Sequence, residues 1–116
     1  AYKLNVYYDV GRSSVQPGSV SELLKLRDLL LKNPSLAVEI SSHTDANGNA
    51  VTNEELSQRR ANAIVRYLTS EGIDRARLIP VGYGEVLLTN DCSDGVDCPE
   101  WMHQENRRTE FRIIRQ

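Results

Sequence analysis

The stretch SSHTDANGNAVTNEELSQRRANAIVRYL, residues 41–68, decides the fold, because it connects a strand to a long helix through a polar loop. Just upstream, LAVEISS at 36–42 alternates, with Val38 and Ile40 on one face. A period of two with one apolar face is typical of a half-buried strand. We therefore expect this strand to end where the loop begins.

The second half of the same stretch has the signals of a helix. Thr52 and Glu55 stand at the spacing of a capping box, in which each side chain bonds the backbone of the other residue. We expect the helix to open there and to run to about Glu71. Gly72 follows, and glycine is the usual residue just beyond a helix end.

Three other segments have strand patterns. YKLNVYYDV at 2–10 and RTEFRIIR at 108–115 both alternate between apolar and polar residues. RLIPVGYG at 77–84 contains Pro80, and proline is confined to edge strands and irregular ends because it lacks a backbone N–H. We expect the segment at 77–84 to lie at an edge of the sheet.

A first helix is predicted ahead of these last strands. Ser19 and Glu22 form another possible capping box, an apolar leucine-rich face follows, and Asn33-Pro34 ends the helix. The predicted order is β-α-β-α-β-β. This order is typical of a two-layer α/β sandwich of the α+β type, in which the helices pack on one mixed sheet.

Length and charge restrict the class of protein. The chain has 116 residues, enough for one domain with one core, and we expect residues 1–116 to form a single unit. The formal net charge is −2, whereas nucleic-acid binders usually carry a basic surplus. The aliphatic runs are far shorter than the roughly 20 residues of a spanning helix.

An arginine falls on the apolar side of the second helix. With Ile64 at the centre of the buried side, Arg60 lies about 40° away and Asn53 about 20° away at 100° per residue. Its neighbour Arg59 lies about 140° away, on the solvent side. A buried guanidinium needs a partner, because desolvating an unpaired charge is very costly.

Asp45 is the acid that the chain delivers to that end of the helix. Two interpretations stay open: an internal Asp45–Arg60 salt bridge that pins the loop, or a split pair that grips both ends of a zwitterionic ligand. Arg107 shares strand parity with Thr109, so it faces the helices. It is either a second cation for a bound anion or an ordinary edge arginine.

The polar stretch at about 85–105 is long for a loop inside a compact domain, and such loops are often functional. It contains Cys92 and Cys98, which are either two free thiols or, as we expect, a disulfide. A disulfide is typical of oxidising compartments outside the cytoplasm. Trp101 is expected to pack over the core, with docking of another protein as the alternative.

Catalytic and metal-binding alternatives have weaker support. His43 and Asp45 are the one tempting acid–base couple, but they stand two residues apart at a strand end, with no serine or cysteine evidently placed to use them. We expect His43 to bond to the loop. A zinc site would need His43, Asp45, His103, Cys92 and Cys98, and C-x5-C is not a common structural zinc spacing. No enzyme, metal or cofactor is expected.

Four motifs in order resemble the OmpA-like C-terminal domain, a family that includes peptidoglycan-associated lipoproteins and the periplasmic parts of outer-membrane and flagellar stator proteins. They are SSHTDANGN at 41–49, LSQRRANAIVRYL at 56–68, RLIPVGYGE at 77–85 and NRRTEF at 106–111. The family pattern reads roughly GHTD, LSxxRA, GYGE and NRR. The resemblance covers nearly the whole chain.

The chain departs from the family pattern at three places. Ser42 replaces the glycine before HTD, and Val10 follows Asp9 where an aromatic is usual. The cysteine-containing insert resembles a version found in Bacteroidetes envelope proteins. The aspartate and arginine of the family motifs are intact.

The resemblance implies a function and a location. The family binds peptidoglycan without cutting it, through the meso-diaminopimelate of the stem peptide. On this chain the corresponding contacts are Asp45, with Thr44 beside it in the same motif, and Arg60, Asn53 and Arg107. We therefore expect a wall-binding domain from the C-terminal part of a larger envelope protein, in the periplasm at the outer membrane of a Gram-negative bacterium.

Partners follow from the same resemblance. The expected partner is a diaminopimelate-type stem peptide, with other envelope proteins as possible further partners and no nucleic acid. Membrane attachment is expected only through a part of the protein outside this sequence. The alternative is a periplasmic protein-interaction module that uses residues 85–105, with Asp45–Arg60 as a structural salt bridge.

Overall fold

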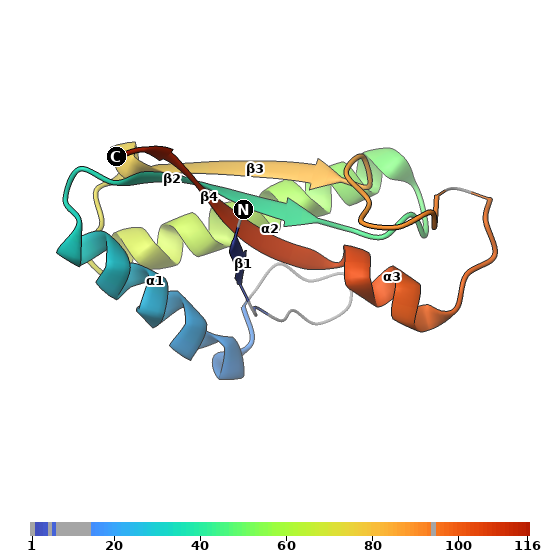
Figure 1. Cartoon of the computed structure of the whole chain (residues 1–116), viewed down its shortest axis with the longest axis horizontal. Helices are drawn as coiled ribbons and strands as arrows, with labels where there is room; N and C mark the ends of the chain where they lie inside the picture. The colour runs from blue at the N-terminus through green and yellow to red at the C-terminus, as the bar shows by residue number, and fades with distance from the viewer. Residues whose placement is uncertain (1, 5, 7–14, 94) are drawn as a thin grey trace.

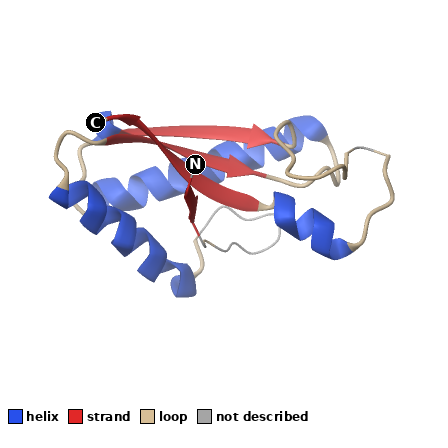
Figure 2. Ribbon diagram, in the orientation of Figure 1, coloured by secondary structure: helices blue, strands red, loops and turns tan. Residues whose placement is uncertain are grey.

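Helices cover one face of a four-stranded sheet in the computed structural model of the chain, which describes residues 2–4, 6, 15–93 and 95–116 (Figures 1 and 2). The elements are β1 (Tyr2–Leu4), α1 (Val20–Lys32), β2 (Ala37–His43), α2 (Ala50–Ser70), β3 (Leu78–Gly84), α3 (Glu100–Asn106) and β4 (Arg108–Arg115), with 3-10 turns at Pro17–Ser19 and Arg75–Arg77. The predicted α+β sandwich is confirmed.

The sheet is mixed, with strand order β1-β4-β2-β3. Strands β2 and β3 are parallel, while β4 lies antiparallel to both β1 and β2. The strand at 77–84 is at an edge, as Pro80 predicts. Of the strand expected at 2–10, the structure describes β1 and Val6; Tyr8, Asp9 and Val10 lie outside the described residues.

The core lies between the sheet and the two long helices. It combines leucines of α1, the inward side chains of β2 and the apolar face of α2. Thr109 and Phe111 of β4 point to this side and are buried, as their parity predicts. The whole described part contains no helix long and apolar enough to cross a membrane.

The start of α2 differs from the prediction. The helix begins two residues before Thr52, because Asn49 is its N-cap: the Asn49 side-chain oxygen accepts hydrogen bonds from the backbone N–H of Val51, at 2.9 Å, and of Thr52, at 3.2 Å. The capping box predicted at Thr52 and Glu55 is therefore wrong. The helix ends at Ser70, and Gly72 follows with φ +97°.

The start of α1 is placed correctly, but its cap works differently. Ser19 is the N-cap residue, yet its side chain makes no capping hydrogen bond. The backbone of Ser19 is already helical, with φ −90° and ψ −9°, because it closes the 3-10 turn Pro17–Ser19. An N-cap side chain normally reaches the first turn from an extended backbone.

Strand β3 lies so close to α2 that a Cβ added at Gly82 would collide with the backbone of Gln58. The N–H of Gly82 donates to the Gln58 side chain at 2.9 Å, and the N–H of Gly84 donates to Ser57 Oγ at 2.9 Å. Gly84 has φ +56°, a conformation that suits glycine. The motif serine Ser57 thus fixes the end of β3 beside the loop that carries Asp45, since Thr44 N–H donates to the carbonyl of Gly84 at 2.8 Å.

Candidate ligand-binding site

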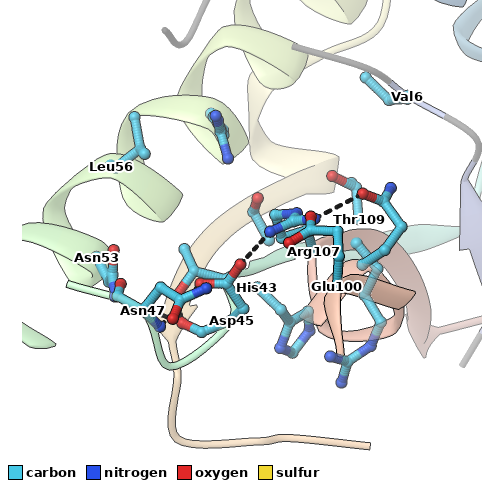
Figure 3. A pocket seen from close by; sticks show the side chains of 14 residues that line it. Val6, His43, Asp45, Asn47, Asn53, Leu56, Glu100, Arg107 and Thr109 are labelled. Atoms are coloured by element: carbon cyan, nitrogen blue, oxygen red, sulfur yellow. Dashed lines mark hydrogen bonds and ion pairs between the residues drawn. The ribbon is translucent and has the colours of Figure 1, made fainter. Parts of the chain in front are cut away.

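A cavity of about 540 Å³ opens at the carboxyl end of β2, between the first turns of α2, the helix α3 and the start of β4 (Figure 3). Five side chains that the sequence singled out line it together: Thr44, Asp45, Asn53, Arg60 and Arg107. These residues come from three separate segments. The fold therefore assembles the predicted set in one place.

Asp45 is held on both carboxylate oxygens. It follows the end of β2 and is 6% exposed. Its Oδ1 accepts a hydrogen bond from the backbone N–H of Asn47 at 2.9 Å, and its Oδ2 forms an ion pair with Arg107 (Figure 3). The carboxylate is thus oriented by the loop backbone and by a cation from across the cavity.

Arg107 is the arginine that pairs with Asp45. It lies at the C-cap of α3, where its second terminal nitrogen contacts Glu100 and Gln104 of the same helix. From the sequence, Arg60 is the expected internal partner of Asp45 if the pair is structural. The ion pair with Arg107 holds the loop in the structure, so an Asp45–Arg60 bridge is not needed to explain how the loop is fixed.

Arg60 lies on the buried side of α2, as the helical geometry predicts. It is 9% exposed, while Arg59 is on the exposed side. Ser57, Ala61 and Ile64 are buried on the same side of the helix. Arg60 therefore brings a positive charge to the cavity that Asp45 also lines.

Asn53 and Thr44 bond to the loop backbone. The Asn53 side chain donates to the carbonyl oxygens of Asn47, at 2.8 Å, and of Asp45, at 3.4 Å. The Thr44 hydroxyl donates to the carbonyl of Asp45 at 2.9 Å. Both residues line the cavity, and both also keep the Asp45 loop in one conformation.

His43 is a buried, uncharged wall of the same cavity. Its ring stacks on Tyr83 with centroids 5.2 Å apart. Neither ring nitrogen makes a hydrogen bond in the described part of the chain, although Nε2 lies 3.5 Å from a carboxylate oxygen of Glu110. Burial, followed by the positive charge of Arg108, lowers the pKa of His43 to about 4. The expected hydrogen bond from His43 to the loop is wrong, because the residue ends β2 and its ring packs against β3.

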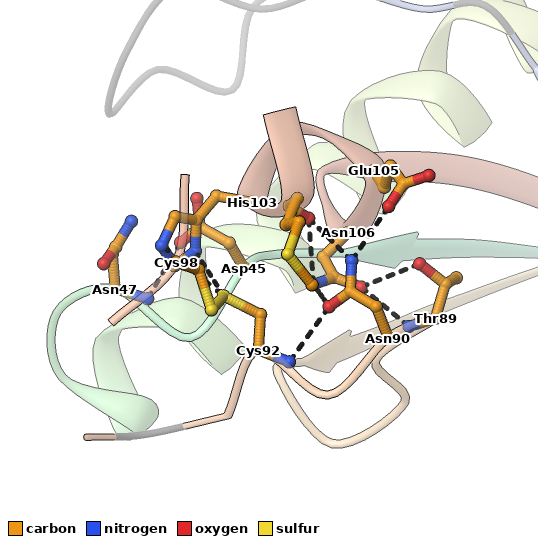
Figure 4. Close-up of a disulfide and its surroundings, with 10 residues drawn as sticks. Asp45, Asn47, Thr89, Asn90, Cys92, Cys98, His103, Glu105 and Asn106 are labelled. Atoms are coloured by element: carbon orange, nitrogen blue, oxygen red, sulfur yellow. Dashed lines mark hydrogen bonds between the residues drawn. A yellow bond between two sulfur atoms is a disulfide. The ribbon is translucent and has the colours of Figure 1, made fainter. Parts of the chain in front are cut away.

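The polar insert at 85–105 contains a helix that the sequence pattern does not predict. α3 runs from Glu100 to Asn106 and belongs to the cavity wall. The segment before it carries the Cys92–Cys98 disulfide, which confirms the expected bridge (Figure 4). Cys92 is fully buried, with its sulfur 3.4 Å from the His103 ring.

Two asparagines fasten α3 to this segment (Figure 4). Asn106 accepts from the backbone N–H of Thr89 at 2.7 Å and donates to the Asn90 side chain at 3.0 Å. Asn90 in turn donates to the carbonyl of Met102 at 2.9 Å. The insert is thus tied to the helix that carries Arg107.

The expectation for Trp101 is contradicted, and three side chains that could bind a metal lie close together in the insert. Trp101 is 63% exposed, so the expectation that it packs over the core is wrong: α3 buries His103 and Asn106 instead. Cys92, Cys98 and His103 do cluster. Zinc binds the thiolate form of cysteine, and here both sulfurs are joined in the disulfide.

Several known proteins similar to this chain are outer-membrane or peptidoglycan-associated proteins of bacteria. Outer membrane porin F of Pseudomonas fluorescens is 37% identical over 111 residues, 96% of this chain and 32% of the porin. The peptidoglycan-associated lipoprotein of Pseudomonas aeruginosa is 32% identical over 107 residues, 91% of this chain and 60% of the lipoprotein. The chain thus spans about a third of the porin and well over half of the lipoprotein.

The fold matches a solved relative of the same kind. The crystal structure of the peptidoglycan-associated lipoprotein from Burkholderia pseudomallei aligns with a TM-score of 0.79 and 27% identity, covering 96% of this chain and 88% of that one. These are outer-membrane and wall-associated proteins rather than enzymes, in agreement with the expected class and location at the outer membrane. The OmpA family model matches residues 7–100, and the chain belongs to the OmpA family.

Proposed function

We propose that this chain binds peptidoglycan non-covalently through the meso-diaminopimelate of the stem peptide, and so anchors an envelope protein or the outer membrane to the wall. The observation that carries the proposal is the gathering of Asp45 and Arg60 in one cavity. The similarity to peptidoglycan-associated lipoproteins supports the same partner. Whatever precedes or follows these residues in the whole protein would supply the other end of the anchor.

The chemistry fits an amino-acid end group. The end carbon of diaminopimelate carries an ammonium and a carboxylate. A carboxylate offers about four lone-pair sites, and Asp45 uses one for Asn47 N–H and one for Arg107, which leaves acceptor capacity for the ammonium. Arg60 takes the ligand carboxylate with its planar fork, a geometry that lysine does not offer.

Neighbouring residues support these two contacts. Asn53 and Thr44 hold the Asp45 loop, and Arg107 orients the Asp45 carboxylate while adding positive charge on the side where the ligand carboxylate enters. Preorganised side chains of this kind lower the entropy lost on binding. Individual sites are expected to bind modestly, and a polymeric wall multiplies the effect through many linked sites.

Selectivity against lysine-type stem peptides follows from the same contacts. Within a stem peptide, the lysine side chain ends in an ammonium without a carboxylate, so it offers Arg60 no anion to bind. A charge-assisted hydrogen bond contributes about 1.5–3 kcal/mol, so the absence of this contact corresponds to a loss of at least about tenfold in affinity.

The experiment is an amide-shift titration of the labelled domain with meso-diaminopimelate and, separately, with lysine amide, which carries no free carboxylate. Saturable shifts at Asp45, Asn53 and Arg60 with the first ligand only are expected. Arg60→Ala and Asp45→Ala should abolish them, while Arg59→Ala, one residue away on the exposed side of α2, should leave them intact. A folded Arg60→Ala variant that still binds diaminopimelate or wall sacs would contradict the assignment.

The exposed aromatic of the insert supports a second candidate, a periplasmic protein-interaction module. Trp101 and Val86 are both largely exposed within the insert segment. In that case Asp45 and Arg107 are purely structural, and neither ligand shifts the amides of the folded domain. Saturable binding of diaminopimelate at Asp45 rejects this candidate as the main function of the chain.

A further inference from the structure

Both terminal nitrogens of Arg107 are engaged by acceptors of the protein itself. One nitrogen pairs with Asp45, and the other contacts the carboxylate of Glu100 and, at 2.8 Å, the side-chain oxygen of Gln104 (Figure 3). A carboxylate from a ligand that approaches Arg107 must therefore share or displace one of these acceptors. The acceptor that is held less firmly is the one that a ligand can displace.

The two acids around Arg107 differ in how firmly they are held. The Asp45 side chain is 9% exposed and has a second hydrogen bond from Asn47 N–H. The Glu100 side chain is 73% exposed, and the contact recorded for it in the described structure is with Arg107. Exposed ion pairs contribute little, because water solvates both partners when they separate. Glu100 is the exchangeable partner.

The position of Glu100 is nonetheless fixed by the fold. It is the first residue of α3, and the Asn90–Asn106 hydrogen bonds together with the buried Cys92 hold that helix against the insert. Glu100 also lines the cavity itself. Its backbone thus stays at the rim while its side chain is free to turn into water.

We infer that Glu100 determines ligand selectivity by competing with ligand carboxylates for Arg107. The inference rests on the proposed function, in which a carboxylate enters beside Arg107. A simple anion can pair with Arg107 only if Arg107 gives up its contact with Glu100. The anion then also meets the negative charge of Glu100 nearby. A zwitterion compensates, because its ammonium reaches Asp45. The insert thereby biases the cavity against plain carboxylates.

The test compares Glu100→Gln with Glu105→Gln in the same domain. Both changes remove one negative charge from α3, and both keep a side-chain oxygen, which at 105 preserves the acceptor for Asn90. Acetate and meso-diaminopimelate are the two probes, each followed by the amide and side-chain signals of Arg107. Breaking an exposed ion pair corresponds to about a two- to fivefold change in affinity.

The expected result is that Glu100→Gln binds acetate about two- to fivefold more tightly than Glu105→Gln, with a smaller gain in the same direction for diaminopimelate. Equal acetate affinities in the two variants overturn the inference. So does weaker diaminopimelate binding in Glu100→Gln, because it would place Glu100 on the ligand ammonium. If the parent domain does not bind diaminopimelate but the two variants still differ in acetate affinity, the proposed function fails and the competition at Arg107 stands.

Discussion

Replacing Gly82 by alanine tests the close contact between β3 and α2. A Cβ at this position would lie 2.5 Å from the Cα of Gln58 and 2.6 Å from Ser57 Oγ, and closer still to the backbone nitrogen of Gln58. The obstructing atoms are mostly backbone, so a side-chain rotation does not relieve the clash. Overpacking of this kind costs about 1–3 kcal/mol, and we expect the upper end, because the strand must move away from the helix.

The assay is thermal unfolding followed by far-ultraviolet circular dichroism, with Gly18→Ala as the control. A Cβ at Gly18 meets no atom within 4 Å, so that substitution should change little. For a domain of this size, about 3 kcal/mol corresponds to a fall of about 10 °C in Tm. A Gly82→Ala variant with the same Tm as Gly18→Ala would refute the packing argument. The same variant should weaken ligand binding, because it separates Gly84 from Ser57 beside the Asp45 loop.

Three further predictions concern single features. Asn49→Ala removes the cap of α2 and should lower the free energy of unfolding by about 1 kcal/mol in a urea titration; an unchanged urea midpoint would show that the cap is unimportant. Because the folded pKa of His43, about 4, lies below its ordinary 6.5, its contribution to stability is fully present above pH 6.5 and is lost as pH falls toward 4, by roughly 2–3 kcal/mol. His43→Gln should flatten that part of the urea-midpoint profile, and a variant with the parent's pH dependence would contradict this. Replacing Cys92 and Cys98 by serine should cost about 2 kcal/mol in the chain-entropy model and weaken diaminopimelate binding through α3; unchanged binding would show that α3 is held without the bridge.

The helical period of α2 made most of the site predictable. A regular helix fixes which residues share a face, so the burial of Arg60 and the exposure of Arg59 follow from spacing alone. Strand parity predicts that Arg107 faces the helices; the residue caps α3 one position before β4 begins, and it lines the cavity. These features depend on local geometry that one sequence reveals.

The features that the sequence did not reveal depend on distant contacts. α3 has only seven residues inside a polar segment, and its position is set by the disulfide and by Asn90 and Asn106, which no periodicity indicates. The ion pair of Asp45 with Arg107 joins residues 62 apart in the chain. Nothing in the helical wheel of α2 could choose Arg107 over Arg60 as that partner.

The insert and the ligand site depend on each other physically. α3 carries Glu100 and Gln104, and Arg107 forms its C-terminal cap, so any shift of this helix changes both the orientation of Asp45 and the charge at the rim. The Asp45 loop itself is fixed separately, by Asn53 and by the Thr44–Gly84 contact. Changes in the insert should therefore alter affinity and selectivity while the loop keeps its conformation, whereas changes at Asn53 or Gly84 should disrupt the Asp45 loop directly.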